Sequence, residues 1–343
     1  GRSPSVQSEG PQRNAVVKKE GTKPMRYAIV DVGSNSARMA VYQVEPGSTD
    51  FVNLYTQRQM LSLLSFLEGD RFRQAGVETA VRCLREFQQA AQEQKADSLH
   101  CFATAAFRRM SNQREVLNQI AAQTGISLQV LDGATEALYA YRGNLGPIRT
   151  QNADLLIDMG GGSTELIDCA DPSLRQSLPF GSLSLYRQFV SGDNGVKTLL
   201  SLNDSYAPNI ASLLKEDEIE KYVAKLVKST GFTEKSYPSL ILIGGTGRAI
   251  GKTMERLLHP DRKQPGSFHG YSAALKELEE ALSLFPTDSR LAEETILQID
   301  ADRLKTLLPG LAAYRALFAA VGCRRFCISD LGLREGYLYS LLR

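Results

Sequence analysis

The chain carries the stretch Ile29-Val30-Asp31-Val32-Gly33-Ser34-Asn35-Ser36-Ala37-Arg38-Met39, which aligns without a gap on Leu156-Ile157-Asp158-Met159-Gly160-Gly161-Gly162-Ser163-Thr164-Glu165-Leu166. The offset is constant at 127 residues, the distance from Asp31 to Asp158. Each copy has an apolar segment, an Asp, a turn of small residues and a second apolar segment, which predicts a β-hairpin. A hairpin made twice predicts two related domains that face a shared cleft.

Both turns have the composition of a phosphate site. Glycine lets backbone N–H groups approach an anion, because no Cβ is in the way, and successive N–H groups form an anion-binding nest. The candidate phosphate-binding residues are Ser34, Asn35, Ser36 and Arg38 in the first turn, and Gly160, Gly161, Gly162, Ser163 and Thr164 in the second.

The two Asp residues, Asp31 and Asp158, would repel a bare phosphate, so the arrangement requires a bridging cation. Mg²⁺ suits it, because this ion takes few protein carboxylates and completes its shell with waters and phosphate oxygens. The alternative without function is two glycine-rich hairpins in which an Asp serves as a turn residue.

Composition narrows the class of protein. The 343 residues suffice for two domains, and 43% hydrophobic with 23% charged residues is normal for a soluble globular protein. A net charge of +2 is too small to suggest a nucleic-acid binder, and no apolar run approaches the length of a membrane span. Five cysteines at irregular spacing indicate reduced, mostly buried thiols of a cytoplasmic protein. For Cys323 and Cys327, a core strand is favoured over a metal pair.

Residues 1–24 are rich in Ser, Gly, Pro, Gln and Lys, without the apolar core of a secretory signal. We expect them to form a disordered tail. The first domain is then 25–150, and its periodicity predicts a mixed α/β fold with one sheet. The predicted strands are 27–32, 38–44, one within 51–67, 99–104 and 127–131. The predicted helices are 77–94, one between the capping residue Asn112 and the closing Gly125, and one that starts near Thr135.

The second domain, 151–343, follows a polar connector at 146–152 and repeats the hairpin. Its predicted strands are 153–159, 239–243 and 324–329. Its predicted helices are 183–190, 219–227, one that follows the Gly244–Gly247 turn and ends at about 258, and 275–285. Further helical segments continue to 321. A final helix follows, for which packing on the first domain stays open. Strand 239–243 leads directly into Gly244–Gly247 and a helix N-terminus, so Gly245 and Thr246 are further candidates for binding an anion.

Taken in order, the motifs resemble those of the exopolyphosphatase and guanosine pentaphosphate phosphohydrolase (Ppx/GppA) family from about Met25 to the C-terminus. The motifs are Asp31 to Arg38, Thr104-Ala-Ala-Phe-Arg108, Asp132-Gly-Ala-Thr-Glu136-Ala137, Asp158 to Glu165, Gly244-Gly-Thr246, Phe268-His-Gly-Tyr271 and Leu333-Arg-Glu-Gly336. The resemblance implies two ribonuclease H-like domains of the actin/sugar-kinase/Hsp70 superfamily flanking a cleft, which agrees with the internal repeat.

The resemblance also implies hydrolysis of the terminal phosphoanhydride of inorganic polyphosphate, or of the 5′-γ-phosphate of guanosine pentaphosphate (pppGpp). Glu136 falls on the catalytic glutamate and Arg108 on the arginine that contacts substrate phosphate. Asp158 and Glu165 fall on carboxylates associated with Mg²⁺, to which the repeat adds Asp31. In such chemistry a carboxylate orients a water and takes its proton, while an Arg and Mg²⁺ neutralise the charge on the transferred phosphoryl group.

Each assignment has a structural alternative. Glu136 can be a first-turn glutamate favoured by the helix dipole, and Arg108 a surface ion-pair partner, as we expect of Arg109. Glu165 lies in a strand and can point to either face. The family's glutamate-rich run is reduced here to the single acid Glu136. Longer members carry helical C-terminal domains that this sequence lacks, so we expect shorter polyphosphates or nucleotides as substrates.

Four functions remain at this point. They are a Mg²⁺-dependent exopolyphosphatase, a pppGpp 5′-phosphohydrolase, a small-molecule kinase of the same superfamily, and a non-catalytic polyphosphate or alarmone sensor. The motif order favours the first two over the kinase. The expected partners are the phosphate substrate alone, with no nucleic acid and no membrane, and a homodimer stays open.

Overall fold

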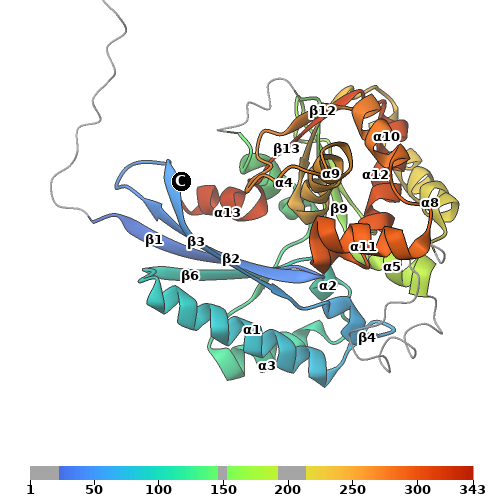
Figure 1. Ribbon diagram of the computed structural model, residues 1–343. Coiled ribbons are helices and arrows are strands. Elements are labelled where there is room, and N and C mark those ends of the chain that lie inside the picture. The colour runs from blue at the N-terminus through green and yellow to red at the C-terminus, as the bar shows by residue number, and fades with distance from the viewer. Residues whose placement is uncertain (1–22, 146–152, 192–213, 343) are drawn as a thin grey trace, which may run out of the picture.

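The computed structural model describes residues 23–145, 153–191 and 214–342, which form two α/β units (Figure 1). Most of the expected tail, 1–22, and the whole connector, 146–152, lie outside the described residues. Each unit contains one mixed sheet, in agreement with the fold class that the repeated hairpin predicts.

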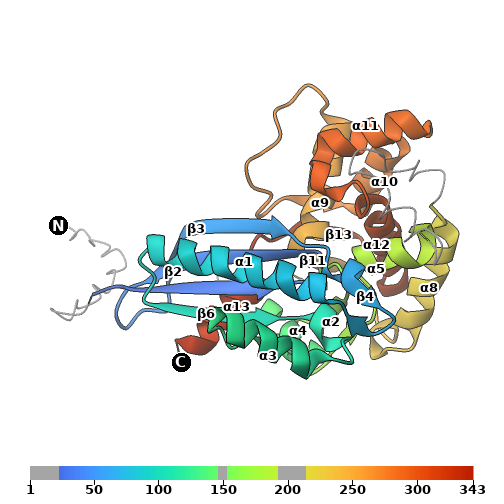
Figure 2. The same ribbon diagram turned by 90° about the horizontal axis from the view of Figure 1, so that it is seen from below.

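The sheet of the first unit has the strand order β3-β2-β1-β6-β7. The first three strands are antiparallel neighbours, and β6 and β7 run parallel to β1. Helices α1 and α3 cover one face of this sheet (Figure 2). The bounds are β1 Met25–Val32, β2 Ser36–Val44, β3 Phe51–Met60, β4 Leu67–Glu68, β5 Arg71–Phe72, α1 Gln74–Glu93, β6 Ser98–Ala103, α2 Ala105–Arg108, α3 Gln113–Thr124, β7 Gln129–Val130 and α4 Gly133–Arg142.

The second sheet repeats this order as β10-β9-β8-β11-β13 and adds β12 at its edge. Here β8, β9 and β10 are antiparallel, and β11 and β13 run parallel to β8. The bounds are β8 Leu155–Met159, β9 Thr164–Asp168, β10 Arg175–Leu178, α5 Ser182–Tyr186, α8 Glu216–Lys228, β11 Ser239–Ile243, α9 Gly244–Leu258, β12 Ser272–Ala274, α10 Leu275–Ser283, α11 Ser289–Asp300, α12 Leu307–Val321, β13 Arg325–Ile328 and α13 Leu333–Leu341.

The third strand lies within 51–67, as predicted, and ends at Met60 because Ser62 adopts a left-handed conformation (φ 48°) and Leu63–Phe66 forms a 3₁₀ turn. Three local expectations need correction. Asn112 does not cap α3 with its side chain; its amide instead bonds the backbone N and O of Phe72, at 2.8 and 3.0 Å, and ties the helix to β5. The helix expected at 183–190 is α5 followed by a π-helical turn at Arg187–Ser191.

Helix α4 begins two residues earlier than expected, because the Asp132 side chain caps it by accepting from the Thr135 N–H at 2.8 Å. Strand β10 was not expected, since its four residues are mostly polar. In contrast, α3 ends as predicted at Gly125, which takes the left-handed conformation (φ 71°) that glycine favours.

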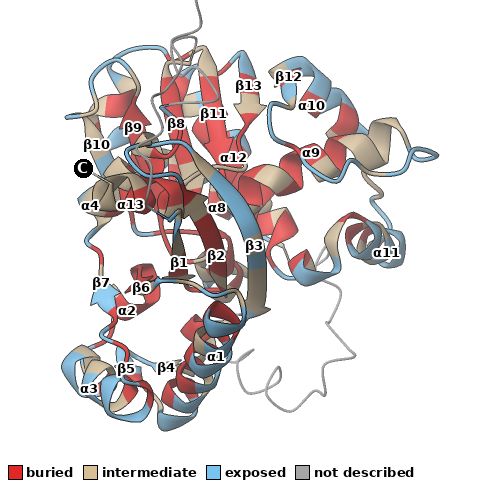
Figure 3. Ribbon diagram, turned by 90° about the vertical axis from the view of Figure 1, so that its left-hand side faces the viewer, coloured by how far each residue is buried: buried red, intermediate tan, exposed pale blue. Residues whose placement is uncertain are grey.

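Two helices cross between the units. Helix α4 comes from the first half of the sequence but packs on β9 and β10 of the second sheet. Helix α13 ends the chain but packs on β1 of the first sheet and along α4 (Figure 1). The two helices therefore lie side by side between the sheets (Figure 3).

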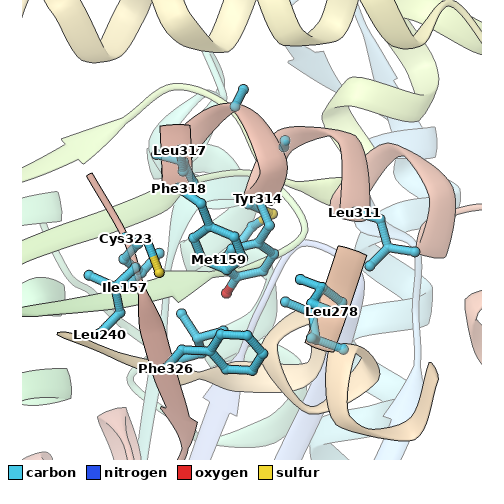
Figure 4. Packing of buried hydrophobic residues seen from close by; sticks show 14 of the residues in the cluster. Ile157, Met159, Leu240, Leu278, Leu311, Tyr314, Leu317, Phe318, Cys323 and Phe326 are labelled. Atoms are coloured by element: carbon cyan, nitrogen blue, oxygen red, sulfur yellow. The ribbon is translucent and has the colours of Figure 1, made fainter. Parts of the chain in front are cut away.

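Alternate residues of the central strands face different cores, which explains why these strands read as unbroken apolar runs. In β8, Leu155, Ile157 and Met159 join the large core beneath α8, α9 and α12, whereas Leu156 packs on α4. Figure 4 shows the large core, where the rings of Phe318 and Phe326 stack with their centroids 5.7 Å apart. In β1, Ala28 and Val30 face α1 and α3, and Ile29 faces α13. Figure 3 shows these inner strands buried and β3 largely exposed.

All five cysteines are free; Cys83, Cys101 and Cys323 are buried, and Cys169 and Cys327 are half-buried. Within the part of the chain that the structure describes, no single helix has both the length and the apolar composition of a membrane span. One pair, Ser289–Arg303 and Leu307–Val321, meets both requirements only when taken together, and it is bent by 88°.

Candidate functional site

The two repeated hairpins have the same backbone. Asp31 pairs across its hairpin with Arg38, and Asp158 pairs with Glu165 at the equivalent position. Each turn is closed by the same hydrogen bond, from Gly33 N to Ser36 O at 3.1 Å and from Gly160 N to Ser163 O at 3.0 Å. The gapless sequence repeat is therefore also a structural repeat.

The two turns touch one another. A Cβ added to Gly162 would lie 2.4 Å from the Ser34 hydroxyl oxygen, and one on Gly161 would lie 2.9 Å from the Asn35 Cβ. Ser34 and Asn35 are correspondingly buried, with 3% and 9% exposure. Only glycine permits this approach, so the second turn needs its glycines for contact with the first.

A cavity of about 120 Å³ opens beside this contact, between the two units. It is lined by most of the residues expected from the sequence, namely Asp31, Ser34, Asn35, Ser36, Arg38, Glu136, Asp158, Gly160, Gly161, Gly162, Ser163, Gly245 and Thr246. Arg108, Thr164 and Glu165 are not among the lining residues. Thr164 is fully buried and its hydroxyl donates to the Phe180 carbonyl oxygen at 2.7 Å.

Two carboxylates at the strand ends form one wall of the cavity. Desolvation and the nearby charge of Asp31 raise the pKa of Asp158 to about 6, and desolvation also raises the pKa of Asp31. The Oδ1 atom of Asp31 is buried without a hydrogen-bond partner. Gly244, with φ 79°, passes so close that a Cβ there would lie 2.5 Å from Asp158 Oδ1.

Arg108 lies behind this wall and links two further acids. Its Nη1 donates to Glu136 Oε2 at 2.5 Å and to the Leu131 carbonyl oxygen at 2.9 Å, and its Nη2 lies 3.8 Å from Glu165 Oε1. Glu165 is 1% exposed and accepts from the Ser177 hydroxyl at 2.7 Å. Burial, followed by the charge of Glu165, raises the pKa of Glu136 well above its ordinary value. Burial, followed by the charge of Asp158, raises the pKa of Glu165 to about 7.

Arginines that sequence reasoning missed also line the cavity. Arg248, Arg303 and Arg334 line the cavity together with Arg38. Each of the three has a buried guanidinium nitrogen without a hydrogen-bond partner: Nη2 in Arg248 and Nε in Arg303 and Arg334. Burial and the other guanidinium groups lower the pKa of Arg38 well below its ordinary value and that of Arg303 to about 10. Unpaired donors and crowded positive charge around a cavity are the features of an anion site.

These arginines carried different signals in the sequence. Arg248 follows the Gly244–Gly247 turn by one residue, and Arg334 lies within the quoted Leu333-Arg-Glu-Gly336 motif, so both could have been found. Arg303 had no local signal. It lies against the third turn, since a Cβ on Gly245 would be 1.8 Å from its Nη2, and its Nη1 donates to Thr246 Oγ1 at 3.4 Å.

The expectation that Arg109 is a surface ion-pair partner is wrong. Its Nη2 donates to the carbonyl oxygens of Gly162 at 2.7 Å and Pro179 at 3.0 Å, and no ion pair involves it among the described residues. From the end of α2 in the first unit, Arg109 therefore holds the second turn in place.

The donor set at the cavity is compatible with Mg²⁺. Asp31 and Asp158 supply carboxylate oxygens, one of them an orphaned buried atom. No group of three His, Cys, Asp or Glu side chains is arranged to hold a metal in the described ranges. Mg²⁺ binds through one or two carboxylates together with substrate phosphates, so the two Asp side chains fit this ion.

Comparisons with known proteins agree with this site. The sequence profile of the Ppx/GppA phosphatase family matches residues 40–343. A Haemophilus influenzae protein named "Putative exopolyphosphatase" is 25% identical over 316 residues, covering 92% of this chain and 90% of that protein. A guanosine-5′-triphosphate,3′-diphosphate pyrophosphatase of Aeromonas hydrophila is 26% identical over 92% of this chain, which spans 59% of that protein's length.

Two solved structures share the fold. An Aquifex aeolicus member of the Ppx/GppA family superimposes with a TM-score of 0.68 at 22% identity, covering 93% of this chain and 98% of that one. An exopolyphosphatase from Cytophaga hutchinsonii superimposes with a TM-score of 0.73 at 18% identity over the same shares. The chain therefore has the same two-unit α/β fold as these proteins.

Proposed function

Since the chain belongs to the Ppx/GppA phosphatase family, we propose that it hydrolyses the terminal phosphoanhydride bond of inorganic polyphosphate and releases orthophosphate. The observation that carries this proposal is a cavity at which two glycine-rich turns meet, and which is lined both by carboxylates and by the four arginines Arg38, Arg248, Arg303 and Arg334. A linear polyanion matches this lining, because its terminal phosphate fits the turns and the remaining phosphates fit the arginines.

In the proposed reaction Glu136 acts as the general base. It takes a proton from a water molecule, whose oxygen attacks the terminal phosphorus, and the bond from that phosphorus to the bridging oxygen breaks. Orthophosphate and a chain shorter by one phosphate result. A raised pKa makes Glu136 a stronger base, and the 2.5 Å contact with Arg108 favours the ionised form that the step needs.

The other residues bind and orient the substrate. Backbone N–H groups of the two turns and the side chains of Ser34, Asn35, Ser36 and Ser163 hold the terminal phosphate, and Arg38 with the other cavity arginines neutralises the chain behind it. Asp31 and Asp158 would hold Mg²⁺, which neutralises phosphate charge when bound. Glu165, 1% exposed beside Arg108, would act on Glu136 through that arginine.

A second candidate substrate is pppGpp. It is supported by the Aeromonas relatives, which are named as guanosine-5′-triphosphate,3′-diphosphate pyrophosphatases. The 5′-triphosphate of this nucleotide ends in the same phosphoanhydride as polyphosphate, so the same cavity and the same base would serve.

Phosphate release by the purified protein with Mg²⁺ tests the proposal. Short-chain polyphosphate, long-chain polyphosphate and pppGpp would be compared in parallel. We expect release from polyphosphate, and in Glu136→Gln we expect kcat to fall by about 10² to 10⁴-fold, the usual contribution of a general base.

The matched control is Glu115→Gln, since Glu115 also lies in the first turn of a helix but is exposed and pairs with Arg71. Its kcat should stay within about twofold of wild type. Preference for pppGpp would establish the second candidate. Binding of polyphosphate without release of phosphate would overturn both and leave a sensor.

A further inference from the structure

The first turn of the C-terminal helix α13 lies inside the cavity. Gly332, Leu333, Arg334 and Glu335 all line it, although they are about 300 residues away from Asp31 in the chain. We propose that Arg334 is a positioning residue of the hydrolytic site, which holds Asp31 in place and links it through α13 to the helix that carries Glu136. This inference rests on the proposed phosphatase function.

Arg334 lies within ion-pair distance of Asp31. Arg334 Nη1 lies 4.0 Å from Asp31 Oδ2, and the side chains are 13% and 20% exposed. Among the described residues, Arg334 is the one cationic side chain within ion-pair distance of Asp31. In the same described ranges the Asp31 carboxylate accepts no side-chain hydrogen bond, and its Oδ1 is buried without a partner. The orientation of Asp31 therefore depends on Arg334.

Arg334 is itself held by a buried network. The Tyr42 hydroxyl donates to Glu335 Oε1, and Glu335 Oε2 accepts from the Gly332 N–H at 2.8 Å. Tyr42 is fully buried and Glu335 is 3% exposed. Because Tyr42 belongs to β2, which pairs directly with the strand of Asp31, this network fixes the first turn of α13 against the first hairpin.

The same helix touches α4 at backbone distance. A Cβ on Gly336 would lie 1.7 Å from the Tyr139 carbonyl oxygen, and one on Gly143 would lie 2.1 Å from the Gly332 carbonyl oxygen. The Asn144 amide also donates to the Leu331 carbonyl oxygen at 3.1 Å. Since α4 carries Glu136 in its first turn, α13 connects the proposed metal-binding Asp31 with the proposed base.

A role in packing alone does not require an arginine at this position. The apolar side of α13, with Leu333, Tyr337 and Leu338, packs against Ile29, Tyr42 and Phe102 of the first sheet. In addition to this packing, the guanidinium of Arg334 lines the cavity and has an unpartnered Nε. The charge of Arg334 thus serves the site.

The experiment combines an unfolding cycle with kinetics. Asp31→Asn, Arg334→Met and the double variant would be unfolded in urea without Mg²⁺, which needs no activity. Arg334→Met should lower the urea concentration at the unfolding midpoint. If Arg334 positions Asp31, this decrease should be smaller by at least about half in the Asp31→Asn background, because the effects of substitutions at contacting residues do not add. Equal losses in both backgrounds would overturn the proposal.

Kinetics on polyphosphate supply the second readout. We expect Arg334→Met to lower kcat by about 10²-fold, the scale of losing a preorganised group, with KM within about threefold, and Arg334→Lys to recover part of kcat. Arg142→Met, the same change on half-buried α4 surface outside the cavity, should leave kcat unchanged. A rise in KM without loss of kcat would instead make Arg334 a substrate-binding residue and overturn the positioning role.

The two proposals fail separately. If the wild-type protein releases no phosphate from any substrate, the proposed function is wrong, and the unfolding cycle alone decides whether Arg334 holds Asp31. If wild type is active and the cycle shows no coupling, only the positioning role is wrong.

Discussion

The first and second turns share a backbone and differ in charge at one equivalent position. In the first hairpin Asp31 faces Arg38, whereas in the second Asp158 faces Glu165. Opposite charges directly across a strand pair stabilise it, and like charges destabilise it. The second hairpin therefore depends on a cation from elsewhere, and Arg108 lies 3.8 Å from Glu165.

This difference in charge suggests that the two turns bind different groups. The first turn is flanked by Arg38 and Arg334 and has the charge of an anion site. The second hairpin carries two buried acids: burial, followed by the charge of Asp31, raises the pKa of Asp158 to about 6, and burial, followed by the charge of Asp158, raises that of Glu165 to about 7. A site with surplus negative charge favours a cation or a proton.

The largest expected effect is loss of the carboxylates. Asp158→Asn and Asp31→Asn should each lower Mg²⁺-dependent kcat by about 10²–10³-fold, the scale of losing one preorganised electrostatic group. Affinity for Mg²⁺, measured by calorimetry, should fall further in Asp158→Asn, because Arg334 already offsets the charge of Asp31. Asp171→Asn, an exposed control, should match wild type. A greater loss of affinity in Asp31→Asn would contradict the division between the turns.

The contact between the turns should give a smaller effect. Gly162→Ala places a methyl group 2.4 Å from the Ser34 hydroxyl and must push the turns apart, whereas Gly160→Ala makes only an ordinary contact at 3.5 Å. We expect Gly162→Ala to cost about 1–3 kcal/mol of unfolding free energy, as overpacking does, and to lower kcat/KM by about tenfold or more. Gly160→Ala should be close to wild type in unfolding free energy. Similar losses in the two variants would show that spacing between the turns is not the cause.

The smallest expected effect is on the pH dependence of stability. An acid whose folded-state pKa lies above its unfolded value stabilises the fold below the unfolded pKa, and this contribution is lost as pH rises through the folded pKa. For Glu165 the window runs from its ordinary 4.5 to about 7. In EDTA, the Tm of Glu165→Gln relative to wild type should therefore increase by several degrees from pH 5 to pH 8. Calorimetric melting at four pH values measures it, and a flat difference would contradict the raised pKa.

Much of the fold and part of the site could be read from the sequence. The repeated hairpin predicted two related α/β units, and an Asp at each strand end predicted where two carboxylates would stand. These features depend on neighbours in the chain: apolar runs make strands, and small residues make the turn. Prediction from local sequence failed where a side chain makes its hydrogen bonds to a residue far away in the chain. Asn112, for example, bonds Phe72 of β5 instead of capping its own helix.

The sequence alone thus determined the hairpins, their duplication and the positions of Asp31 and Asp158, because backbone geometry follows from local residue pattern. Only the tertiary structure decided that Glu165 does not line the cavity, that α4 and α13 cross between the units, and that Arg248, Arg303 and Arg334 converge on the cavity. Such convergence depends on how elements hundreds of residues apart pack together. Arg334 reaches Asp31 only because glycines at 143 and 336 let two helices meet backbone to backbone.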